Sequence, residues 1–370
     1  MEHEFTTQIK GVLSKEFGQD ADTIYNVSSL MQYLNIKTRS AMRGSKARGS
    51  FANLYAIYVL VEDYLERGFG GRKDYSNYEG AKFTDLFQRQ RELPFGGRLQ
   101  NHALNNRTNE EFKGYFPQVE FVPILRNLTT NRYWINENLL KVGVGRRKHN
   151  LAKTVIAIIK KYIEAKRSAF KRFIETSEQL KNIGTQEDAL VEEFIMGLLA
   201  PNVDARVFEV VSYAILKYFY HDQTVYFGFD LDNVQAENLK LYKTGRTNAN
   251  DGGIDFVMRP LGRFFQVTET LDIKKYLLDI DKIEKYPISF VIKSEESVEN
   301  LRKRLKEGAE KRYAVNAIVE KYMNCIEEVI DLSVLRERLQ TAASLGYLRD
   351  ILNEIVIQSK IEFNYEEEAD

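Results

Sequence analysis

The chain has 370 residues, 44% of them hydrophobic and 12% aromatic, which is enough for two globular domains with separate cores. No apolar run approaches the roughly 18 residues of a membrane span, and residues 1–4 lack the basic and apolar regions of a secretory signal. A single cysteine, Cys325, excludes an intrachain disulfide. These features predict a protein of a reducing, cytoplasmic compartment.

The net charge of zero hides two regions of opposite sign. Residues 35–172 hold 27 Lys and Arg against 12 Asp and Glu, a balance of +15. Residues 201–370 hold 23 against 30, a balance of −7. A basic block of this size favours a polyanionic partner, nucleic acid above all, although lysines that only solvate helix faces are a simpler alternative.

The first half of the chain reads as mainly helical. Its first thirty-odd residues suggest helix with a polar loop. Apolar residues at helical spacing predict a helix over 50–67 that ends at Gly68. Loops and short elements are expected over 68–150, which is rich in Gly, Asn and Arg. A long basic helix over 151–183 and a second helix at about 186–199 complete this half.

The second half alternates helices and strands. Asp204 is a candidate N-cap for a helix over 205–220. The pattern then predicts a strand at 225–227, a hairpin at 253–269, a helix at about 271–284, a strand at 288–292, three helices within 295–360, and a disordered acidic tail at 366–370. Helix, strands, helix and strand in this order indicate an α/β (α+β) fold.

The hairpin has the chemistry of a metal site. Asp255 follows two glycines and opens the first strand, and Pro260 and Gly262 form the turn. Strand alternation directs Gln266 and Thr268 to one face and Phe265 and Val267 to the core, with Glu269 pointing away unless the strand ends there. The Asp255 carboxylate, the Gln266 amide oxygen and the Val267 carbonyl are oxygen ligands of the kind that Mg²⁺ takes.

A further acid lies in the helix expected at 205–220. Glu209 is flanked by Phe208 and Val210, and an acid in such surroundings is costly to bury unless it is paired or bound to metal. Pairing with Arg206 is the simple explanation, and metal binding is the alternative.

Together these residues resemble the PD-(D/E)XK nuclease core of type II restriction endonucleases and Mrr-like proteins, over roughly residues 204–294. The resemblance implies that Glu209, Asp255 and Gln266 surround Mg²⁺, with Mn²⁺ as an alternative. The family's lysine falls at Thr268, which cannot supply a positive charge. Lys243, Arg246, Lys274 or Lys275 is then expected to reach in from a neighbouring element, or Glu269 turns inward and acts on the attacking water.

The basic first half contains candidate DNA-binding side chains. Arg, Asn and Gln read base edges, whereas Lys and Arg on phosphates position the protein. The candidates for base reading are Arg89, Arg91, Arg98, Gln100, Asn101, Asn105, Asn106 and Arg107. The candidates for phosphate contact are Arg43, Lys46, Arg48, Arg146, Arg147 and Lys148, with Arg246 and Asn248 in the turn before the hairpin. For any single residue, a polar surface loop is the simpler interpretation.

The hypothesis from the sequence is a Mg²⁺-dependent, sequence-specific endonuclease of double-stranded DNA. It divides the chain into a helical recognition region (1–200), a nuclease core (201–295) and C-terminal helices for dimerisation (296–370). A homodimer is expected because cutting both strands of a palindrome needs two sites, and a DNA methyltransferase is the expected functional companion. A non-specific repair or recombination nuclease and a non-catalytic DNA-binding protein with a degenerate nuclease fold remain as alternatives.

Overall fold

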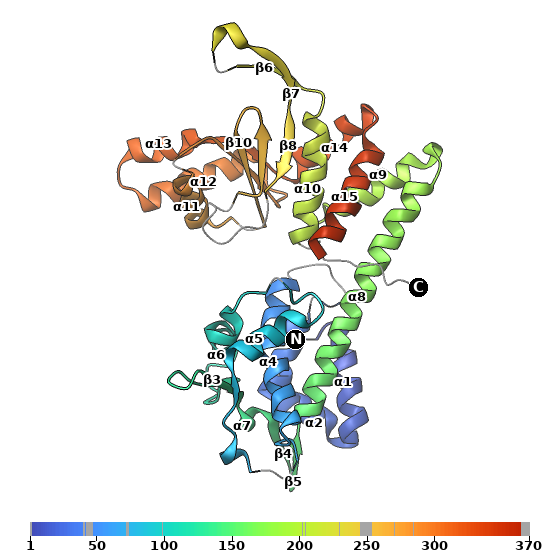
Figure 1. Ribbon diagram of the computed structural model, residues 1–370, viewed down its shortest axis with the longest axis vertical. Helices are drawn as coiled ribbons and strands as arrows, with labels where there is room; N and C mark the ends of the chain where they lie inside the picture. The colour runs from blue at the N-terminus through green and yellow to red at the C-terminus, as the bar shows by residue number, and fades with distance from the viewer. Residues whose placement is uncertain are drawn as a thin grey trace. The chain divides into compact units, whose positions relative to one another are not determined.

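A computed structural model of the chain forms two compact units, Met1–Phe173 and Ile174–Asp370, shown from blue to green and from green to red in Figure 1. The structure describes residues 2–39, 41, 47–71, 74–97, 99–201, 203, 205–228, 230–244, 254–269, 271–283 and 285–363. The fold is mixed α/β and mostly helical, at 62%, with small sheets. No helix in the described ranges is long and apolar enough to cross a bilayer.

The first unit combines helices with short strands, and the strands lie within residues 68–150, where the sequence indicated only loops and short elements. Its helices are α1 (Glu4–Phe17), α2 (Ala21–Val27), α3 (Ser29–Thr38), α4 (Ala47–Glu66), α5 (Phe83–Glu92), α6 (Thr108–Tyr115), α7 (Glu137–Leu140) and α8 (Ala152–Asn182), which continues into the second unit. Its strands are β1 (Ala81–Lys82), β2 (Ile124–Asn127), β3 (Arg132–Ile135), β4 (Lys141–Val144) and β5 (Arg147–Asn150). The helices expected at 50–67 and 151–183 are confirmed as α4 and α8.

Helix α4 lies at the centre of the first core. Every residue from Leu54 to Val61 is buried, because the helix is apolar around most of its circumference. Aromatic rings hold it to its neighbours: Phe51 packs 5.1 Å from Tyr162 of α8, and Tyr162 packs 6.0 Å from Phe5 of α1. The basic region is therefore built on an aromatic core.

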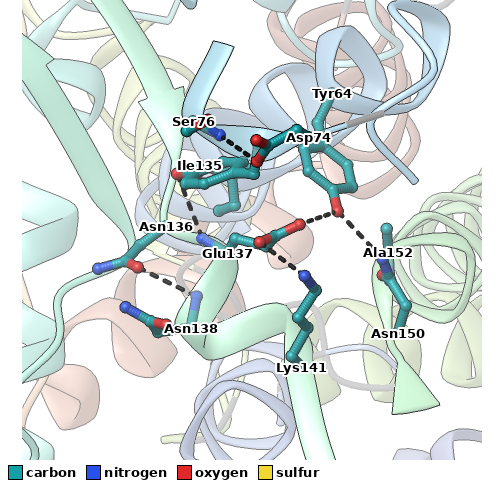
Figure 2. A network of polar contacts seen from close by, with 11 residues as sticks. Tyr64, Asp74, Ser76, Ile135, Asn136, Glu137, Asn138, Lys141, Asn150 and Ala152 are labelled. Carbon is teal, nitrogen blue, oxygen red and sulfur yellow. Dashed lines mark hydrogen bonds and ion pairs between the residues drawn. The ribbon is translucent and has the colours of Figure 1, made fainter. Parts of the chain in front are cut away.

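A polar network fastens the end of α4 to the elements that precede α8 (Figure 2). The Tyr64 hydroxyl donates to Glu137 Oε1 at 2.8 Å and accepts from Asn150 Nδ2 at 3.1 Å. Lys141 Nζ lies 2.8 Å from Glu137 Oε2, so the carboxylate is shared between a phenol and an ammonium group. These contacts join α4, α7, β4 and β5 through groups that satisfy one another.

The second unit contains a five-stranded sheet between helices. Its helices are α9 (Asp188–Gly197), α10 (Ala205–Tyr220), α11 (Ile273–Lys282), α12 (Val298–Arg312), α13 (Asn316–Cys325), α14 (Leu332–Ser344) and α15 (Leu348–Phe363). Its strands are β6 (Thr224–Phe227), β7 (Gln235–Asn238), β8 (Lys240–Lys243), β9 (Phe256–Arg259), β10 (Arg263–Thr268), β11 (Ile288–Ile292) and β12 (Ile326–Ile330).

The main sheet has the order β12-β11-β10-β9-β8. Strands β8, β9 and β10 are antiparallel neighbours, whereas β10, β11 and β12 run parallel. Helix α10 covers one face, where Tyr213 lies 5.3 Å from Phe256. Helix α11 covers the other face, where Tyr276 lies 4.5 Å from Phe290. Both faces of the central strands are therefore buried.

The second half confirms most of the expected elements, but strands β7 and β8 were not predicted and residues 295–360 differ from the expectation. The helix at 205–220 and the strand at 288–292 have the expected bounds, and the turn of the hairpin places Gly262 at φ +66°. Residues 295–360 hold four helices and the strand β12 instead of three helices. Strand β12 could not be recognised from the sequence, because its five residues contain two glutamates and follow α13 directly. Asp204 and residues 366–370 lie outside the described residues.

Candidate active site

Asp255 lies at the start of β9, held by backbone bonds on both sides. Its N–H donates to the carbonyl of Phe265 on β10 at 2.9 Å, and its own carbonyl accepts from the N–H of Thr244 at 2.9 Å. Its Oδ2 accepts from the N–H of Val267 at 2.7 Å. The carboxylate is thus fixed at the edge where β9 and β10 part.

Glu209 approaches Asp255 from α10. Its Oε1 lies 2.9 Å from Lys243 Nζ, so the lysine at the end of β8 is the ion-pair partner. Arg206, the partner considered from the sequence, pairs with Glu362 at 3.8 Å. The charge of the helix glutamate reaches the aspartate, which is 46 residues further along the chain (255 minus 209), and contributes to the raised pKa of Asp255.

The negative charge of Glu209 acts on the ionisation of Asp255. Burial, and then the negative charge of Glu209, raise the pKa of Asp255 from its ordinary 3.8 to about 7. The Val267 N–H opposes this rise, as do the positive charges of Lys275 and Lys243. A further positive charge at this place would favour the ionised form of Asp255, so Asp255 is set to gain from a bound cation.

Gln266 carries an amide oxygen that meets no hydrogen-bond partner in the described part of the chain. Continuing the register in which Phe256 pairs with Phe265 sets Asp255 opposite Gln266. The Gln266 side chain is 5% exposed, and its Nε2 donates to the Val267 carbonyl at 3.3 Å. Its Oε1 has no hydrogen-bond partner among the described residues. A buried acceptor left in this way is costly unless a ligand completes it.

Thr268 and Glu269 are engaged elsewhere. The buried Thr268 hydroxyl is hydrogen-bonded to Tyr276 of α11, so it belongs to the packing of that helix. Glu269 Oε1 lies 3.2 Å from Lys293 Nζ. Both side chains are thus engaged with other residues of the second unit.

Lys293 is a buried cation that the sequence did not suggest. Its side chain is 4% exposed, its Nζ donates to the Val203 carbonyl, and the ammonium lies 5.7 Å from the centroid of the Phe208 ring. It directly follows β11, and a lysine placed straight after an apolar strand is the only sequence signal that could have pointed to it. The ion pair with Glu269 joins the ends of β10 and β11.

The donor set suits a hard cation. Two carboxylates, one amide oxygen and one backbone carbonyl are oxygen ligands of the kind preferred by Mg²⁺, which usually needs only one or two protein carboxylates. Over the described ranges, no three or more His, Cys, Asp and Glu side chains group together as metal ligands. The candidate site therefore depends on a mixed set in which Gln266 supplies a neutral oxygen.

The candidate DNA-binding residues fall into two classes. Some are engaged within the protein: Arg89 donates to Glu62 at 2.8 and 3.0 Å, Arg91 to the Gly97 carbonyl at 3.0 Å, Arg147 to Asp20 at 3.1 Å, and Asn105 accepts from Tyr133 at 3.2 Å. Others are exposed, namely Gln100, Asn101, Asn106, Arg107, Arg146 and Lys148. Arg43, Lys46, Arg98, Arg246 and Asn248 lie outside the described residues, as does the side chain of Arg48.

Comparisons with protein-family models, with curated proteins and with solved structures give no match.

Proposed function

We propose that this protein is a Mg²⁺-dependent endonuclease that cuts double-stranded DNA at specific sequences, a type II restriction enzyme with a PD-(D/E)XK core. The observation that carries the proposal is the Glu209–Asp255 carboxylate pair beside the buried Gln266 oxygen, which lacks a partner within the described chain. A helix, the start of a strand and the following strand supply these residues in the order that the resemblance requires.

The chain's own residues divide the chemical work. Glu209, Asp255, Gln266 and the Val267 carbonyl would hold Mg²⁺, or Mn²⁺ in its place. When bound, such an ion polarises a phosphoryl oxygen and lowers the pKa of a bound water. Lys275 places positive charge beside Asp255, which attracts the scissile phosphate and takes over the charge that Thr268 cannot carry.

The substrate follows from the charge of the first half. The balance of +15 over residues 35–172 suits the DNA backbone. Exposed Arg146 and Lys148 are available to phosphates, and exposed Asn106 and Arg107 to bases. Cutting both strands requires two active sites, so we propose a homodimer, with a cytoplasmic location and a DNA methyltransferase that protects the host's own sites.

Plasmid digestion tests the proposal. We expect discrete fragments with Mg²⁺ and none with EDTA, and we expect Asp255→Asn to reduce cutting at least about 10²-fold because a ligand of the cation is lost. Asp331→Asn is the control: Asp331 is a buried aspartate that caps α14, and its Oδ1, like Asp255 Oδ2, accepts a backbone N–H, that of Val334 at 2.8 Å. Full cleavage activity in Asp255→Asn would contradict the assignment of Asp255 to the active site.

The engagement of Thr268 with Tyr276 favours a second candidate, a DNA-binding protein whose nuclease centre has lost activity. Salt-sensitive DNA binding with no cleavage in Mg²⁺ or Mn²⁺ would support that candidate and contradict the endonuclease. Smeared digestion products would instead indicate a nuclease without sequence specificity. The same preparation of wild-type protein distinguishes all three outcomes.

A further inference from the structure

The hairpin formed by β6 and β7 extends away from the main sheet of the second unit (Figure 1). It is a sheet of two strands only, in which Val225 pairs with Glu237 and Tyr226 with Ala236. Tyr226 is 81% exposed and Leu231, at the tip, is 95% exposed. A two-stranded hairpin is marginally stable in water alone, and exposed apolar side chains gathered on one projection mark an interaction surface.

The tip of the hairpin is an ordered turn. The Asp230 carboxylate accepts from the Asp232 N–H at 3.0 Å and from Asn233 Nδ2 at 2.7 Å. A Cβ added at Gly228 would lie 2.5 Å from the Asn233 carbonyl, so only glycine permits the close approach of the two strands. The sequence thus specifies a fixed turn that displays Leu231 to solvent.

The charge of the hairpin excludes DNA as its partner. Residues 222–239 contain four acids and no lysine or arginine; the acids are Asp222, Asp230, Asp232 and Glu237. Phosphates would be repelled by this surface. An exposed apolar surface flanked by acids suits another protein surface better than a nucleic acid.

The two outer edges of the hairpin differ in what they can accept. No described strand other than β7 pairs with β6, whose sequence Thr-Val-Tyr-Phe carries no charge. An antiparallel copy of β6 could add to this edge around a two-fold axis without bringing like charges together. The same addition at β7 would place two Glu237 side chains near each other.

We propose that β6 pairs with β6 of a second copy of this chain, with Tyr226 next to the two-fold axis and Leu231 packed against the partner. The inference rests on the proposed function in one respect, because cutting two strands calls for two copies. Stable interfaces bury roughly 800 Å² per partner, and a contact made by one short hairpin is expected to be weaker, so the free protein should dimerise only at high concentration.

Sedimentation velocity without DNA or Mg²⁺ tests the interface. We expect wild-type protein to move with concentration from the 43.0 kDa monomer toward twice that mass, and Tyr226→Asp to stay monomeric. Leu345→Asp is the control, since Leu345 is 58% exposed among the C-terminal helices, the other candidate dimer surface. A dimer broken by Leu345→Asp but kept by Tyr226→Asp would overturn the proposal, as would a wild-type monomer at about 200 μM.

Cross-linking gives a second measurement. Tyr226→Cys should form an intermolecular disulfide under mild oxidation, because residues at the axis come within the Cα separation that a disulfide allows. Cys325 is buried, and burial raises the pKa of its thiol, so it contributes little background. Equal cross-linking of Leu345→Cys would contradict the assigned contact. Neither measurement depends on cleavage, so failure of the proposed interface can be distinguished from failure of the proposed function. An inactive protein can still dimerise, and a monomeric protein can still nick DNA.

Discussion

Asp255 should make the free energy of unfolding depend on pH in a direction opposite to that of most carboxylates. Its pKa is raised by burial and by Glu209 to about 7, from an ordinary 3.8. In the unfolded chain the pKa of Asp255 returns to its ordinary value. The contribution of the protonated Asp255 to the free energy of unfolding is therefore fully present below about pH 4 and is lost as pH rises to about 7. Asp255→Asn keeps a neutral side chain at every pH and removes this dependence.

The magnitude follows from the two pKa values. Each tenfold step in acidity corresponds to about 1.4 kcal/mol, so the whole difference is at most about 4 kcal/mol. About a third of this is already lost at pH 5. Between pH 5 and pH 8, wild-type protein should therefore lose about 2 to 3 kcal/mol more of its unfolding free energy than Asp255→Asn does.

Urea unfolding in EDTA, followed by far-UV circular dichroism, measures this difference. Fluorescence of Trp134, the single tryptophan, reports the first unit alone and should respond to pH alike in both proteins. At pH 8, Mg²⁺ should restore stability to the wild type and leave Asp255→Asn unchanged, because only an ionised site gains from the cation. Parallel pH curves for the two proteins would refute the charge coupling on which the candidate site depends.

Two further substitutions probe other contacts. Lys275→Met should reduce cleavage about 10²-fold, because Lys275 lowers the pKa of Asp255 and makes no ion pair among the described residues. Lys274→Met, at the neighbouring lysine, is the control and should cut normally in the same plasmid assay. Equal losses of cleavage in the two variants would contradict a specific role for Lys275. Tyr64→Phe should cost about 1–3 kcal/mol in the Trp134 urea transition because Glu137 and Asn150 lose a shared partner. Tyr115→Phe, on a ring 48% exposed, serves as its control, and an unchanged midpoint for Tyr64→Phe would show the network to be dispensable.

The local patterns of the sequence predicted the elements that carry strong periodicity. Helix α10 and strand β11 have the bounds expected, since their apolar residues are dense and their ends are marked. Strand β12 was missed because its two glutamates weaken the pattern, and β7, with the sequence Gln-Ala-Glu-Asn, has no apolar alternation at all. Such strands form because a neighbouring strand is in place.

The partners of the site residues could not be read from local sequence. Glu269 meets Lys293, 24 residues away, only because β11 runs parallel to β10. Thr268 is bound to Tyr276 because α11 folds back over the same face. The residues Glu209, Asp255 and Gln266 could be named from their types and order, whereas the lysine paired with Glu209 required the antiparallel register of β8 and β9.

The energetics of the candidate site point to binding and away from a structural role. A half-buried aspartate close to a second carboxylate lowers stability at neutral pH, and so does a buried amide oxygen without a partner within the described residues. A hydrophobic residue at either position would fill the same space without that cost. Both defects lie on adjacent strands, and both call for positive charge. A single cation bound between Asp255 and Gln266 would remove the two penalties together, which neither Lys243 nor Lys275 achieves in its present place.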